Sequence, residues 1–212
     1  EHGFEFEVSE DLFQRFLYYA EFAPGSVLDK LFELISHNDF PDSDNFITTL
    51  NSTDFYLKLI ERIETDSSLA SIILRYLDTT YHVEDDDPVI VKLLEILEQG
   101  NIVERVEAIR YLHTITTDMP DEFCLFLVDH GIFLLLSDFI ESKIDAMNDI
   151  IPLTSKIVNS VAAAEVDLTD CSGATEIFES LENLLGEYHS DYDHIIELTI
   201  KQFSVGQDDS DC

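Results

Sequence analysis

Apolar residues recur along most of the chain at the three- and four-residue spacing of amphipathic helices. Short polar stretches separate these periodic segments, and the alternation typical of strands appears only at residues 4–8. Helix-starting residues such as Ser67 and Asp121 precede several segments. Gly100 and Gly131 stand where helices should end or turn. The pattern predicts helices at residues 9–21, 26–36, 43–50, 53–65, 67–80, 87–99, 102–116, 120–129, 131–142, 146–163, 174–187 and 190–204.

The helical part of the chain contains a repeat. The heptapeptide at 74–80 (LRYLDTT) matches that at 109–115 (IRYLHTI) 35 residues later, and further units follow at about 45-residue spacing. One helical pair cannot bury its apolar face alone, but stacked neighbours cover each other. We therefore predict an all-α fold, a right-handed stack of helical pairs or triplets; a globular bundle with coincidental spacing is the alternative. The predicted parts are an N-terminal arm (1–8), a single repeat domain (9–206, with units 9–50, 53–80, 87–116, 120–163 and 174–204) and a disordered acidic tail (207–212).

Two segments carry a family resemblance. Residues 126–142 (FLVDHGIFLLLSDFIES) resemble the armadillo pattern of a short helix, a glycine and a helix with closely spaced leucines. Residues 87–115 resemble the second and third helices of that repeat, with Ala108 in the place of a tightly packed alanine. The chain is thus similar to the armadillo/HEAT-like α-solenoid class over about 53–204, and more loosely over 9–50. The resemblance implies that the later helix of each unit lines a concave side.

The chain also departs from one branch of that class. Armadillo proteins that carry basic nuclear-import signals resemble one another in a ladder of Trp and Asn on their third helices. This chain has no Trp, and Asn159 alone falls at the expected asparagine position. The resemblance therefore does not imply a nuclear-import function here.

Alignment of the later helices by the repeat spacing brings similar polar side chains into register. Five of the eleven basic residues lie on these helices, and Tyr and Arg anchor protein interfaces because they bury large areas with directed polar ends. These aligned side chains form a stripe along the later helices. We hypothesise that the stripe binds an extended peptide or a helix of a partner protein. In the alternative interpretation, the arginines pair with nearby carboxylates and the tyrosines merely pack. The candidate binding residues are Arg75, Tyr76, Arg110, Tyr111, Thr114, Lys156, Asn159 and Lys201.

Charge narrows the possible partners. The 212 residues include 45 acidic and 11 basic side chains, for a formal net charge of −34. Nucleic-acid backbones and anionic membranes attract basic surfaces, so we expect neither as a partner. Hydrophobic residues make up 45% of the chain, which is too many for a disordered acidic chain. The acidic surplus is either a solvated outer face or a surface that steers a basic partner.

Motifs for catalysis and metal binding do not appear. The sequence has no phosphate-binding glycine loop, no nucleophile elbow and no zinc-protease motif. Cys124 stands among apolar residues and is typical of an inert core thiol. Residues 189–194 fit no zinc spacing, and residues 42–53 lack the glycine and glutamate of an EF-hand loop. We expect no enzyme activity, no cofactor and no metal.

The remaining expectations concern location and role. Three cysteines without a CxxC pair are typical of a reducing compartment, so we expect a cytoplasmic protein, with a nuclear location possible. The favoured function is a non-catalytic scaffold that binds another protein through its concave helices. The alternatives are an assembly subunit that docks through the ends of the stack, or an acidic surface for a basic protein. The sequence does not predict the oligomeric state.

Overall fold

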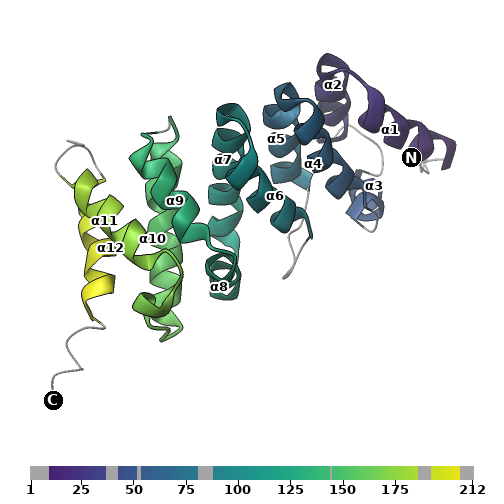
Figure 1. Ribbon diagram of the computed structural model, residues 1–212. Helices are drawn as coiled ribbons and strands as arrows, with labels where there is room; N and C mark the ends of the chain where they lie inside the picture. The colour runs from purple at the N-terminus through teal and green to yellow at the C-terminus, as the bar shows by residue number, and fades with distance from the viewer. Residues whose placement is uncertain are drawn as a thin grey trace. The chain divides into compact units, whose positions relative to one another are not determined.

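The computed structural model describes residues 10–36, 43–51, 54–80, 88–143, 145–185 and 192–205, and in these ranges it contains helices and no strand (Figure 1). Each predicted helix is present. The predicted arm, the alternating pattern at 4–8 and the predicted tail lie outside the described residues. The α-helices are α1 (Glu10–Phe22), α2 (Gly25–Ser36), α3 (Ser43–Asn51), α4 (Phe55–Thr65), α5 (Ala70–Thr80), α6 (Pro88–Gln99), α7 (Ile102–Asp118), α8 (Asp121–Asp129), α9 (Ile132–Glu141), α10 (Met147–Ala163), α11 (Ala174–Leu184) and α12 (Asp193–Val205).

Most helix boundaries differ from the prediction by one to three residues, as the ends of α7 and α11 show. Helix α7 continues past residue 116 to Asp118, and the hydroxyls of Thr116 and Thr117 donate to carbonyl oxygens one turn back within it. Helix α11 stops at Leu184 instead of 187, since Leu185 has an extended backbone. Helix ends depend on such local bonds, which hydrophobic periodicity does not report.

The chain divides into two compact units, Glu1–Ala108 and Ile109–Cys212, with the boundary inside α7. In the first unit, α4 packs against α1, α3, α5 and α6, while α2 packs against α5. Aromatic rings fill the space around α4: the Phe16 ring lies 5.0 Å from that of Phe46 and 5.4 Å from that of Phe55, between centroids. Burial of these rings is a large part of the hydrophobic stabilisation of this unit.

In the second unit, α8 packs against α10, α9 against α11, and α10 against α12. The repeat alignment treats α9 and α11 as equivalent helices, and α10 and α12 likewise. The hydroxyls of Ser137 and Ser180, both buried, meet at 2.8 Å between α9 and α11. The two helices that the repeat alignment equates, α9 and α11, are therefore in direct contact, whereas the stacked repeats and the single repeat domain over 9–206 stay predictions.

A candidate protein-binding surface

The first two predicted binding residues lie on α5 in the first unit, and they face different surroundings. Arg75 is exposed, and its guanidinium lies 2.5 Å from the carboxylate of Asp29 on α2. Tyr76 is buried, with its ring stacked on that of Phe32 at 3.8 Å between centroids. Arg75 is thus a surface residue, while Tyr76 belongs to the core between α2 and α5.

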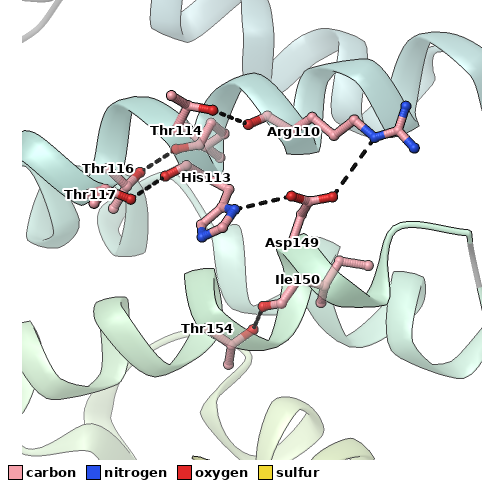
Figure 2. Close-up of polar contacts among 9 residues, drawn as sticks. Arg110, His113, Thr114, Thr116, Thr117, Asp149, Ile150 and Thr154 are labelled. Carbon is pink, nitrogen blue, oxygen red and sulfur yellow. Dashed lines mark hydrogen bonds and ion pairs between the residues drawn. The ribbon is translucent and has the colours of Figure 1, made fainter. Parts of the chain in front are cut away.

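Helix α7 supplies the next three predicted residues, and Figure 2 shows two of them beside α10. Nε of Arg110 lies 3.8 Å from one carboxylate oxygen of Asp149, and Nδ1 of His113 lies 3.1 Å from the other. Thr114 is exposed and donates its hydroxyl to the carbonyl oxygen of Arg110 at 3.0 Å. Tyr111 is buried. One carboxylate at the start of α10 therefore holds two side chains of α7.

Lys156 of α10 takes part in a second contact of this kind, with α8. Its ammonium lies 3.3 Å from a carboxylate oxygen of Asp121, which also accepts a 2.6 Å hydrogen bond from the Ser160 hydroxyl. The Ser160 hydrogen bond, with help from Lys156, holds the pKa of the Asp121 carboxyl below its ordinary value. Lys156 is thus partly engaged in joining α8 to α10.

The last two predicted residues are exposed. The amide of Asn159 donates to the Ser155 hydroxyl at 3.3 Å on the surface of α10, and Lys201 lies exposed on α12. Side-chain contacts at Asp149 join α7 to α10, and α10 packs against α12 in the second unit. We name five polar residues of these helices the α7/α10/α12 face: Arg110, Thr114, Asn159 and Lys201 are exposed, and Ser155 is half-buried.

The predicted set is therefore split. Its polar members lie on helix surfaces, and its two tyrosines lie in the core. Both arginines are near carboxylates, which is the contact that the alternative interpretation of the sequence expects. The binding role of this surface stays a prediction.

The repeat alignment missed a groove in the first unit. The α1/α4 groove has a volume of about 520 Å³. The sequence signals only the exposed aromatics beside the groove: Phe16 and Ala20 form the buried stripe of α1, and the aromatics of the segment YYAEF fall outside that stripe. Its lining includes Leu17, Tyr18, Glu21, Phe55, Lys58 and Leu59.

In the part of the chain that the structure describes, possible metal ligands are dispersed and Cys124 is enclosed. No group of three or more His, Cys, Asp or Glu side chains is placed there to hold a metal ion. The candidate segments at 189–194 and 42–45 lie partly outside the described residues. Cys124 is buried, and burial raises the pKa of its thiol above the ordinary value. A protonated, enclosed thiol is a poor nucleophile.

Among the described residues, no single helix combines the length and apolarity needed to cross a membrane. The pair α8 and α9 meets that requirement of length and composition only when taken together, and a bend of 79° separates the two helices.

Comparisons with known proteins do not place the chain in a family. No family model matches it, and neither a curated protein nor a solved structure is found that resembles it. The armadillo-like resemblance is thus carried by the sequence segments described above, and membership of that class stays a prediction.

Proposed function

We propose that the chain is a non-catalytic, armadillo-like α-solenoid scaffold that binds a peptide or helix of a partner protein. The observation that supports this proposal is the α7/α10/α12 face: α7 meets α10 at Asp149, α10 packs against α12, and polar side chains of all three helices reach solvent in the second unit. Four of the eight predicted binding residues lie on this face: Arg110, Thr114, Asn159 and Lys201.

The chemistry of the face suits a polypeptide ligand. An asparagine amide offers both a donor and an acceptor, so Asn159 can bond the N–H and C=O groups of an extended backbone. Its bond to Ser155, on the preceding turn of α10, orients the side chain before a partner arrives. Arg110 is oriented by Asp149 in the same way. Side chains that are already ordered lose less entropy on binding, which favours affinity.

The test is a pull-down from cell extract, with bound proteins identified by mass spectrometry. A double variant, Arg110→Glu with Asn159→Ala, is compared with the wild type. The matched control is Arg15→Glu with Asn183→Ala, which makes the same chemical changes at exposed positions of α1 and α11. We expect a partner that the wild type and the control capture and the double variant loses. Retention by the double variant, with unchanged helicity, would contradict the proposal.

A second candidate function has one supporting observation, the charge of −34. It is an acidic surface that attracts a basic protein, and such attraction weakens steeply with salt. In the pull-down, this alternative predicts that both double variants capture the same basic proteins and release them at moderate ionic strength. We also propose a cytoplasmic or nuclear location, on the cysteine pattern alone.

A further inference from the structure

The α1/α4 groove has fixed walls. Arg62 of α4 donates hydrogen bonds to the carbonyl oxygens of Ala20 and Ala23 at the end of α1, the second at 2.8 Å. The ring contact of Phe16 with Phe55, at 5.4 Å, joins the same two helices on the buried side. Because both contacts lie within one unit, the groove is a preformed feature of that unit.

One rim of the groove is an exposed aromatic cluster on α1. Tyr18, which lines the groove, is 61% exposed, Phe22 is 62% exposed and Tyr19 is 51% exposed. The ring of Tyr18 lies 5.1 Å from that of Phe22 and 5.8 Å from that of Tyr19, between centroids. Grouped exposed aromatic rings beside an apolar hollow are typical of protein interaction sites.

The charge of −34 on the chain favours a cationic occupant, and so does the position of Glu21 beside Tyr18 in the lining. Lys58 is held by Asp54 at 3.0 Å, and Arg62 is directed at the carbonyls of α1, so both basic groups of the lining are already engaged. Glu21 forms no ion pair within 4 Å among the described residues, although its charge also acts on Lys58 and Arg62, and it follows Tyr18 by about one helical turn. A carboxylate beside the face of an aromatic ring is a favourable place for a Lys or Arg side chain.

The same charges argue against two other occupants. A second copy of this chain also carries −34 and is repelled. The first nine residues of the chain include three glutamates and no Lys or Arg, so they do not complement Glu21.

We propose that the α1/α4 groove docks a basic, amphipathic segment of a partner protein. An apolar side chain of the partner enters between Leu17 and Leu59, and a Lys or Arg one turn away lies over the ring of Tyr18 next to Glu21. The recognition mode is a helix laid in a groove, in which apolar anchors provide affinity and flanking charges provide register. The site belongs to the first unit, so it is independent of the function proposed for the α7/α10/α12 face.

The test uses a labelled synthetic helix of about 14 residues, roughly four turns, with leucine on one face and lysine on the other. Fluorescence anisotropy measures its binding at about 0.15 M salt, where long-range attraction is screened beyond ~8 Å. Matched peptides replace every leucine by serine or every lysine by glutamate. Tyr18→Ala and Glu21→Lys are compared with Glu176→Lys, which makes the same charge change on exposed α11.

We expect the leucine–lysine peptide to bind and both matched peptides to bind much more weakly. Tyr18→Ala and Glu21→Lys should each raise Kd about tenfold, whereas Glu176→Lys changes it less than about twofold. The proposal is overturned in favour of general charge attraction if the serine peptide binds as tightly as the leucine–lysine peptide. It is also overturned if Glu21→Lys and Glu176→Lys raise Kd equally. If the wild type dimerises and the Tyr18→Ala variant is a monomer of unchanged helicity, the groove binds a second copy of the chain and the proposal is overturned.

Discussion

At the scale of single residues, Arg62 shows how one side chain positions an element. The last carbonyl groups of a helix have no partner within the helix and carry partial negative charge. With one guanidinium, Arg62 satisfies one of them, from Ala20, and also the carbonyl of Ala23 just past the end of α1. Partial burial lowers the pKa of this guanidinium from its ordinary value, but an Arg side chain remains charged at any physiological pH.

Arg62→Met should therefore destabilise the first unit. The substitution keeps a long apolar stem but leaves the two carbonyls without their donor, at a cost of about 2 kcal/mol. Arg15→Met is the control, because Arg15 and its partner Asp11 are both largely exposed, and its loss should cost less than about 0.5 kcal/mol. Urea unfolding followed by circular dichroism measures both. Equal free energies of unfolding for the two variants would show that Arg62 does not hold α1.

At the same scale, the repeat spacing did not show which of the predicted binding residues face solvent. Consecutive helical residues point about 100° apart, since a turn holds 3.6 residues. The Arg and Tyr of each RYL motif therefore cannot share one narrow face: Arg75 and Arg110 are exposed, and Tyr76 and Tyr111 are buried. The repeat spacing aligned equivalent positions, but it could not tell which of two neighbours faces solvent.

At the scale of elements, periodicity predicted each helix because an apolar stripe has to be buried for the helix to be stable. The same pattern could not predict the α1/α4 groove. A groove depends on how closely two helices approach, and Arg62 and the rings of Phe16 and Phe55 determine that approach across about 40 residues of sequence.

The glycines that precede α9 and α11 allow a matched test of helix packing. Gly131 and Gly173 have φ near +79° and +80°, so alanine costs about 1 kcal/mol of backbone strain at either position. A Cβ at Gly131 meets no atom within 4 Å, whereas one at Gly173 would lie 2.7 Å from the backbone nitrogen of Leu134 in α9. Gly173→Ala should therefore lower the free energy of unfolding by roughly 1–3 kcal/mol more than Gly131→Ala. If urea unfolding shows that both alanine variants lose the same free energy of unfolding, α11 moves away from α9 at no energetic cost.

At the scale of the whole molecule, charge is the dominant feature. If every one of the 11 basic residues paired with one carboxylate, 34 of the 45 acidic side chains would still lack a cation. Three of the ion pairs among the described residues are largely exposed, and exposed pairs contribute little to stability. Repulsion between carboxylates should therefore outweigh attraction, and it opposes the compact state.

This balance predicts that salt stabilises the protein. Raising sodium chloride from about 0.01 M to about 0.1 M shortens the screening length from about 30 Å to about 10 Å, which weakens repulsion between distant carboxylates more than attraction within contacting pairs. For a chain of this size, a gain of about 2 kcal/mol corresponds to a Tm increase of roughly 4–8 °C, measurable by circular dichroism. Choline chloride at equal ionic strength is the control, because screening does not depend on the identity of the cation. A Tm that falls with salt would mean that ion pairs dominate, and a rise with sodium alone would point to bound cations instead of screening.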